Sequence, residues 1–313
     1  MKTTAFFILA CTVGAFAQHP QIKVGQNADL KGALIMPGDD EWNRGVSKDE
    51  VDPLSDAIIA SIGAETSLHE DFGLVWKGQP GGIPYFVVGG EQPKVPVHFN
   101  EAKDESDPGP YPIPPEAWIE GGPQSDGDRH VLVLDKDNWK LYEIYRAFPI
   151  DGGKAWNAYS GSVFDLKKPK PRPAGWTSAD AAGLPILPGL ARYDEICGTK
   201  KLTHALRFTV KKSRRAYVPP ATHFASTHKD ENLPPMGMRV RLKANFDTSK
   251  FTGAAKVILE GLKIHGMILA DNGGDWFISG APDDRWNHEE LLPIRKVKGK
   301  DLEVVKMKAM TTR

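Results

Sequence analysis

The chain has very little cysteine. Cys11 and Cys197 are its only two cysteines, and Cys11 falls inside an apolar stretch at the N-terminus. Removal of that stretch leaves a single thiol, which excludes an intrachain disulfide. We interpret Cys197, which stands beside Gly198, as an inert and partly buried thiol rather than a nucleophile.

A surplus of charge is also missing. The 313 residues include 40 basic and 40 acidic side chains, and Lys and Arg form no long run. Binding of nucleic acid depends on a basic surface, so we expect no nucleic-acid partner.

Long apolar runs are confined to the first residues, and no transmembrane helix is predicted. Lys2, the apolar residues 5–14 and the small-x-small sequence Ala15-Phe16-Ala17 predict a secretory signal peptide over residues 1–17. The mature protein is then secreted or periplasmic and begins at Gln18. A lipoprotein acylated at Cys11 is the alternative.

Complete catalytic motifs are absent from the sequence. It contains no G-x-S-x-G, no H-E-x-x-H, no P-loop and no Rossmann fingerprint. No motif therefore requires a cofactor, and one divalent cation is the only cofactor that the residues leave open.

Glycine and proline are abundant, with 31 and 25 residues spread among short apolar runs. Helical spacing appears only around residues 54–62 and 253–265. The pattern predicts a mainly β protein with one domain over residues 51–313, preceded by an extended lead-in over residues 18–50. We expect an antiparallel β-sandwich or jelly-roll-like fold with two or three peripheral helices and long Pro/Gly-rich loops.

Three hairpins are predicted. The first joins residues 130–135 to 139–148 through a loop in which Asn138 takes the left-handed position, with Asp135 facing Trp139. The second joins 203–210 to 216–226 and places His204 opposite His223. The third joins 267–271 to 275–279 through an Asn-Gly-Gly turn.

Two polar groups are candidates for chemistry. Asp128 and His130 project from one face of a strand and suit acid/base work or, with Asp126, cation binding. The structural alternative is a turn with an Asp128–Arg146 ion pair.

The second group contains Glu195, His204 and His223, with Asp194 beside them in the sequence. Facing histidines are typical of metal sites and proton relays, whereas single histidines on apolar faces are usually hydrogen-bonded core residues.

Other side chains are weaker candidates. Glu143 lies among aromatics and is either a general acid with a raised pKa or the partner of Arg129. Asp271 and Asp275 flank a turn and are interpreted as turn carboxylates. Four side chains suit stacking on sugar rings or hydrogen bonding to them: Trp156, Trp176, Arg192 and Trp276.

Several segments carry a resemblance, among them DGDRHVLVLDKDNWKLYE, GWTSADAAGLPILPGLARYDEI, HALRFTV and LADNGGDWFISGAPDDRW. Through them the chain, from about Trp42 to Val305, resembles a widespread, functionally uncharacterised group of secreted bacterial proteins. The resemblance implies export and one extended folding unit, and it assigns no catalytic residue.

The sequence thus favours a secreted enzyme that acts on an extracellular polysaccharide, either a glycoside hydrolase or a polysaccharide lyase. A hydrolase needs two carboxyl groups flanking the scissile bond, for which Asp128 and Glu195 are the candidates. A lyase needs a base, for which His204 and His223 are the candidates. The alternative is a non-catalytic glycan-binding or cell-envelope protein.

Overall fold

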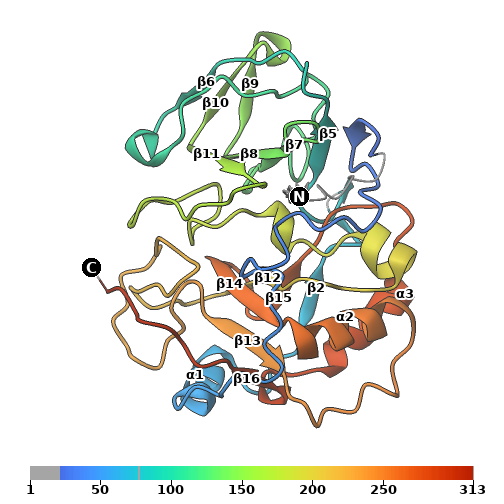
Figure 1. Cartoon of the computed structure of the whole chain (residues 1–313), viewed down its shortest axis with the longest axis vertical. Coiled ribbons are helices and arrows are strands. Elements are labelled where there is room, and N and C mark those ends of the chain that lie inside the picture. Colours follow the sequence, from blue (N-terminus) through green and yellow to red (C-terminus); the bar gives the residue numbers. More distant parts are fainter. Residues whose placement is uncertain (1–21, 77, 313) are drawn as a thin grey trace, which may run out of the picture.

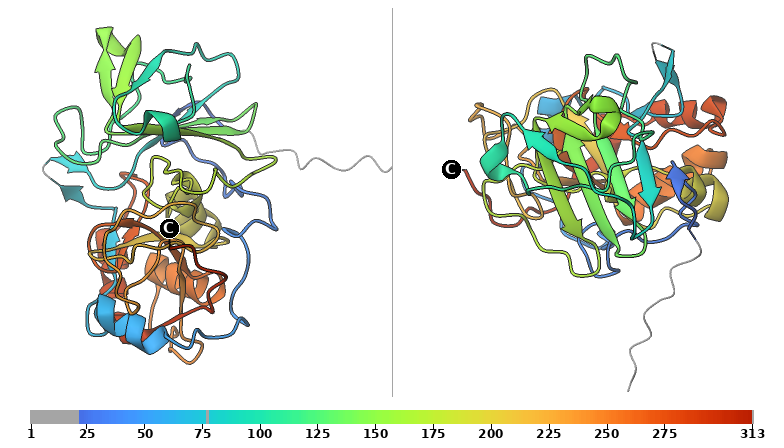
Figure 2. Two further views of the ribbon diagram at one scale, coloured as in Figure 1. Left: turned by 90° about the vertical axis from the view of Figure 1, so that its left-hand side faces the viewer. Right: turned by 90° about the horizontal axis from the view of Figure 1, so that it is seen from above.

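The computed structural model describes residues 22–76 and 78–312, and the fold is mostly β (Figure 1). Three mixed sheets are stacked along the long axis, and none closes into a barrel. A two-stranded ribbon projects from the side of the molecule (Figure 2). The ribbon consists of β3 (Val75–Trp76) and β4 (Gln79–Pro80). The predicted signal peptide and its cleavage site lie outside the described residues.

The upper sheet has the strand order β1-β5-β7-β8-β11. Its strands are β1 (Gly25–Gln26), β5 (Tyr85–Val88), β7 (Val131–Asp135), β8 (Lys140–Tyr145) and β11 (Ser160–Asp165). Alternate residues of β7 point to opposite faces, and both faces are apolar. Leu132 and Leu134 enter the main core, whereas Val131 and Val133 enter a smaller one above. The sheet is therefore interior, as predicted.

A three-stranded sheet covers that smaller core. Its order is β6-β10-β9, with β6 (Val97–Phe99), β9 (Phe148–Ile150) and β10 (Ala155–Ala158). The proline-rich loop over residues 104–118 packs here through Tyr111 and Ile113, which are fully buried. Trp118, at the end of this loop, is 46% exposed.

The lower sheet has six strands in the order β16-β13-β14-β12-β15-β2. They are β2 (His69–Asp71), β12 (Leu206–Val210), β13 (Arg239–Leu242), β14 (Met267–Asn272), β15 (Phe277–Ser279) and β16 (Leu302–Val304).

Helices lie at the lower end of the molecule (Figure 1). They are α1 (Ser55–Ile62), α2 (Gly253–Ile264) and α3 (His288–Leu291). Both longer helices were predicted, and their periodic apolar residues are buried. Short helical turns are η1 (Lys103–Glu105), η2 (Asp151–Gly153), η3 (Leu187–Gly189), η4 (Asp194–Thr199), η5 (Leu292–Lys296) and η6 (Gly299–Asp301).

The long segment over residues 166–205 passes between the upper and lower sheets and bonds to both (Figure 1). Ser178 accepts the Ser160 hydroxyl of β11 at 2.7 Å, and the Ala182 amide donates to Ala270 of β14 at 2.9 Å. Its apolar residues are buried in the main core. This segment sets the spacing of the two sheets and so shapes any cleft between them.

The sheets are not purely antiparallel. Four strand pairs are parallel: β5–β7, β6–β10, β12–β14 and β2–β15. The predicted antiparallel sandwich or jelly roll is therefore not confirmed, although the mainly β composition is.

The first predicted hairpin exists, but its register was wrong by one residue. Asp135 pairs with Lys140, and Leu132 rather than Val131 pairs with Glu143. Trp139, not Asn138, takes the left-handed conformation with φ 53°. The Asp135 carboxylate accepts the amides of Asp137 and Asn138 and closes a longer loop.

The other two hairpins were wrong. In the lower sheet β12 pairs with β14 and β15 and separates them, so residues 267–271 and 275–279 are not neighbours. Residues 216–226 form two isolated bridges, from Tyr217 to Met236 and to Thr311, in place of a strand beside β12. His204 and His223 consequently do not face each other.

Candidate functional site

A cavity of about 570 Å³ opens between the upper and lower sheets. Asp128 and Tyr145 line it from the upper sheet, Asp271 from the lower sheet, and Ser178 and Asp180 from the segment between them. We call this cavity the intersheet cleft. It is lined by more polar than apolar surface, in contrast to the protein's two cores.

One wall of the cleft depends on a β-bulge. In the parallel pair β12–β14, Phe208 lies opposite Leu269 but Thr209 lies opposite Asp271, so Ala270 is an extra residue. In a regular strand Asp271 would point away from Arg207. The bulge reverses the alternation and brings Asp271 to the face that carries Arg207.

Arg207 links two carboxylates at this wall. Its guanidinium makes two bonds of 2.8 Å with the buried Asp180 and reaches the Asp271 carboxylate at 3.2 Å. Burial and the neighbouring charge of Asp180 raise the pKa of Asp271 to about 7, even though Arg207 opposes the shift. Asp271 therefore titrates near neutral pH.

The same face continues across the lower sheet as a polar row. Arg207 donates to the Ser279 hydroxyl of β15 at 2.6 Å, and Ser279 pairs with Asp71 of β2. Desolvation raises the pKa of Asp71, and the nearby carboxylates of Glu120 and Asp128 add to the shift. The upper and lower walls are thus close enough for their charges to interact.

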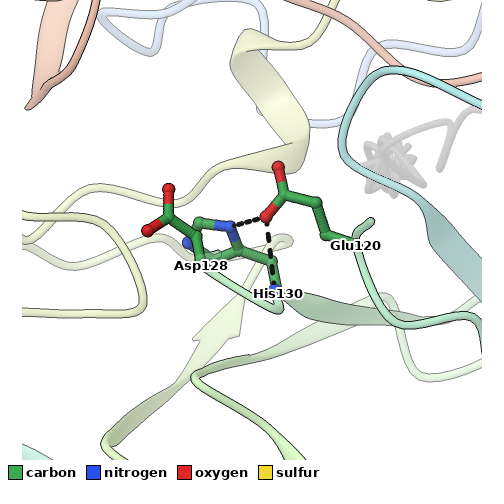
Figure 3. Close-up of side chains that lie close together, drawn as sticks. All are labelled: Glu120, Asp128 and His130. Carbon is green, nitrogen blue, oxygen red and sulfur yellow. Dashed lines mark hydrogen bonds and ion pairs between the residues drawn. The ribbon is translucent and has the colours of Figure 1, made fainter. Parts of the chain in front are cut away.

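Glu120, Asp128 and His130 form a compact group on the upper wall (Figure 3). The Nδ1 atom of the buried His130 lies 2.6 Å from the Glu120 carboxylate, and Nε2 lies 3.0 Å from the Ala179 carbonyl. Burial lowers the pKa of His130, but the charge and hydrogen bond of Glu120 outweigh it and raise the pKa to about 9.

A divalent cation does not suit this group as it stands. One ligand atom from each of the three side chains lies within 4.8 Å of the others, which is compatible with metal coordination. Both ring nitrogens of His130, however, face oxygen acceptors, and a protonated imidazolium satisfies both. A metal would have to displace the proton and break one of these bonds.

Aromatic and histidine side chains complete the cleft. The rings of Tyr145 and Tyr159 meet edge to face at 5.5 Å, and Tyr159 is 40% exposed. Burial is the main cause that raises the pKa of Tyr145. The charges of Asp128 and Asp271 add to this shift, so Tyr145 lies near both carboxylates. His223 lines the cleft and contacts the Ala181 carbonyl at 2.7 Å. Asp128 and His223 therefore both line this cleft, and the buried His130 lies beside Asp128.

Glu195, His204 and Arg192 belong to a separate, closed cluster. Glu195 lies 3.0 Å from Arg192 Nη2 and 3.0 Å from His204 Nε2, and all three side chains are buried. Burial raises the pKa of Glu195, but Arg192 and His204 outweigh it and leave that pKa lowered. The structure thus places Glu195 and His204, proposed from the sequence for catalysis, and Arg192, proposed for substrate binding, in a buried cluster that does not line the intersheet cleft.

The tryptophans proposed for stacking on sugar are mostly inside. Trp156 and Trp276 are 1% and 0% exposed, so neither presents a ring face at the surface. Trp176 is half-buried, with the Arg172 guanidinium 5.6 Å from its ring. Only Trp176 of the three keeps an accessible edge.

Glu143 is neither exposed to the cleft nor paired with Arg129. Its carboxylate accepts the backbone amides of Ile186 and Leu187 at 2.9–3.0 Å and so caps η3. Burial raises its pKa to about 8 despite these bonds. Arg129 donates instead to the Ala147 and Pro123 carbonyls.

Two smaller interpretations can be checked as well. Cys197 is partly buried, and burial raises the pKa of its thiol to about 11, as expected for an inert cysteine. Asp275 accepts the Lys211 amide at 2.8 Å and acts as a turn carboxylate. Asp271, interpreted in the same way from the sequence, belongs to the cleft.

No protein-family model, curated protein or solved structure matches the chain. Within residues 22–76 and 78–312, every helix is too short or too polar to cross a bilayer.

Four residues of the site escaped sequence reasoning: Asp71, Glu120, Asp180 and Arg207. A signal existed for Arg207, since an arginine inside the apolar strand HALRFTV must be paired if it is buried. Asp180 offered a similar signal beside the small apolar residues Ala179 and Ala181. Asp71 and Glu120 carried none, because their positions depend on how distant strands pair.

Proposed function

We propose that the intersheet cleft is the active site of a secreted glycoside hydrolase that acts on an extracellular polysaccharide. The observation that carries the proposal is the raised pKa of Asp271 in an open polar cleft that also contains Asp128. Such a pair matches the acid and the base or nucleophile that glycoside hydrolysis requires. In this proposal Asp271 protonates the leaving oxygen, and the exposed Asp128 acts from the other wall.

Hydrolysis is favoured over lyase chemistry by the charges of the cleft. Glu101, Glu105, Asp128 and Asp271 line it, whereas none of its described lining residues is Lys or Arg. These carboxylates repel uronates, which are the substrates of polysaccharide lyases. A neutral or amino-sugar polymer is therefore the better substrate class.

The alternative is a non-catalytic glycan-binding or cell-envelope protein. The exposed ring of Tyr159 at the cleft favours it, because aromatic faces bind sugars without cleaving them. In that case the polar row would serve only to join the two sheets.

The test is product analysis by mass spectrometry. The protein starting at Gln18 is incubated with a panel of neutral, amino-sugar and uronic-acid polysaccharides, with and without EDTA. Hydrolytic oligosaccharides from a neutral or amino-sugar polymer support the proposal. Unsaturated products would instead indicate a lyase, and binding without any product would favour the alternative.

The matched variants are Asp271→Asn and Asp39→Asn. Loss of the proton donor is expected to reduce kcat by about 10²–10⁴-fold. Asp39 is exposed and does not line the cleft, so its variant should retain full activity. Retained activity in Asp271→Asn contradicts the assignment.

A further inference from the structure

A second region, separate from the intersheet cleft, has the features of a ligand site. It surrounds Trp118, which is 46% exposed and whose backbone amide donates to the Gln26 side chain at 2.8 Å. Trp118 and Pro282 both line two cavities, of about 340 and 270 Å³. Because the two cavities share these residues, they are adjacent, and we call them together the Trp118 groove.

The larger cavity is a rigid apolar surface. Six prolines line it: Pro80, Pro84, Pro115, Pro123, Pro149 and Pro282. Their rings cannot change φ, so the cavity is largely formed before a ligand arrives. The buried Trp156 is also among its lining residues, and the indole Nε1 of Trp156 has no hydrogen-bond partner among the described residues.

The rim of the groove supplies polar groups that are free to bind. Among the described residues, the Gln79 side chain has no hydrogen-bond partner, and its amide lies against Gly122 (φ 87°), where a Cβ would come within 2.9 Å. The Asn27 amide nitrogen and the exposed Asp284 carboxylate are likewise unpaired. Asp283 and Arg285 are already paired with each other at 2.6 Å.

This combination selects one class of ligand. A pyranose ring has an apolar face of C–H groups that stacks on an aromatic ring, and hydroxyls around its edge that bind amides and carboxylates. The groove provides the aromatic ring in Trp118 and the edge partners in Gln79, Asn27 and Asp284. It has no unpaired Lys or Arg among its described lining residues to attract an anionic sugar.

We propose that the Trp118 groove is a second glycan-binding site, specific for neutral oligosaccharides and distinct from the intersheet cleft. It holds a polymer by stacking and hydrogen bonding and carries out no bond cleavage. The inference does not require that the cleft be catalytic.

The test measures the binding of neutral hexasaccharides by isothermal titration calorimetry and saturation-transfer NMR. The hexasaccharides are cellohexaose, xylohexaose, laminarihexaose and chitohexaose. The full mature chain should bind at least one of them. Trp118→Ala should weaken that binding by at least about tenfold, because it removes the stacking surface. Trp118→Phe, which keeps an aromatic face, should restore most of it.

Phe148→Ala is the matched control. Phe148 is 43% exposed but lines neither cavity of the groove. Its variant should bind as the unchanged protein does. The inference is overturned if no hexasaccharide binds, if Trp118→Ala binds as well as the unchanged protein, or if a proline-rich peptide binds in place of every sugar.

Discussion

Two clusters in this protein use the same kinds of side chain and differ in access and charge balance. In the closed cluster, Arg192 stands between Glu195 and Asp194, and His204 completes the pairing out of reach of solvent. In the intersheet cleft, Arg207 is largely committed to Asp180, and Asp271 is left with a raised pKa beside an open cavity. Residue type therefore does not distinguish the two clusters, whereas access to an open cavity does.

The largest effect on stability is expected in the closed cluster. Glu195→Gln removes the carboxylate that balances the buried Arg192, and we expect the free energy of unfolding to fall by about 3 kcal/mol. Urea unfolding monitored by circular dichroism measures the change. Glu116→Gln, which changes an exposed carboxylate that belongs to neither cluster, is the control and should leave stability unchanged. An unchanged free energy of unfolding in Glu195→Gln would contradict the distinction between a closed cluster of compensated charges and the open cleft.

Glu143 allows a test of how a buried carboxyl group without an ion-pair partner affects stability. Burial raises its pKa to about 8, above the ordinary value of 4.5 expected in the unfolded chain. Between these values the folded protein binds the extra proton, so its free energy of unfolding should fall as pH rises, by up to about 1.4 kcal/mol per pH unit. Glu143→Gln has no group to titrate and should lose this component of the slope. An unchanged slope in urea unfolding at several pH values contradicts the assignment.

The upper wall of the cleft is tested through His130. Its pKa of about 9 exceeds the ordinary 6.5, so the pair with Glu120 stabilises the fold fully below pH 6.5 and less as pH rises through 9. Glu120→Gln removes the charge and leaves burial, so the pKa of His130 should fall below 6.5. NMR titration of the ring protons measures it. Glu116→Gln, in the same loop, should leave the pKa near 9.

The smallest effect concerns the pH at which activity declines. If Asp271 is the proton donor, kcat/KM should fall above a pH of about 7. Asp180→Asn removes the repulsion that raises the pKa of Asp271 and should move this decline to lower pH. The profile is recorded at a temperature where circular dichroism shows the variant to be folded. If kcat/KM of Asp180→Asn declines at the same pH as that of the unchanged protein, a group other than Asp271 causes the decline.

Local structure could be predicted from the sequence better than the pairing of strands. Both α1 and α2 were predictable, because a helix is coded by neighbours along the chain. The position of β12 between β14 and β15 was not, because alternation in a strand says nothing of which strand lies beside it. The predicted His204–His223 pair was wrong for this reason.

The site was predictable only in part. Asp128 and His223, proposed from the sequence, line the cleft, and the buried His130 lies beside Asp128. Asp271 was assigned to a turn, because a bulge at Ala270 leaves no mark in the pattern of apolar residues. The burial of Glu195 and His204 was not predictable, since the sequence shows which residues are charged but not which of them are compensated.

The bulge has a consequence for the evolution and the engineering of the fold. The wall of the cleft depends on the pairing register of β14 as much as on its residues, since the bulge at Ala270 decides which side of the sheet Asp271 occupies. A regular register that kept Ala270 in the ladder would turn Asp271 away from Arg207, whereas deletion of Ala270 would leave Asp271 opposite Thr209 on the Arg207 face. A shift of strand register could therefore break the Arg207–Asp271 pair without exchanging any amino acid.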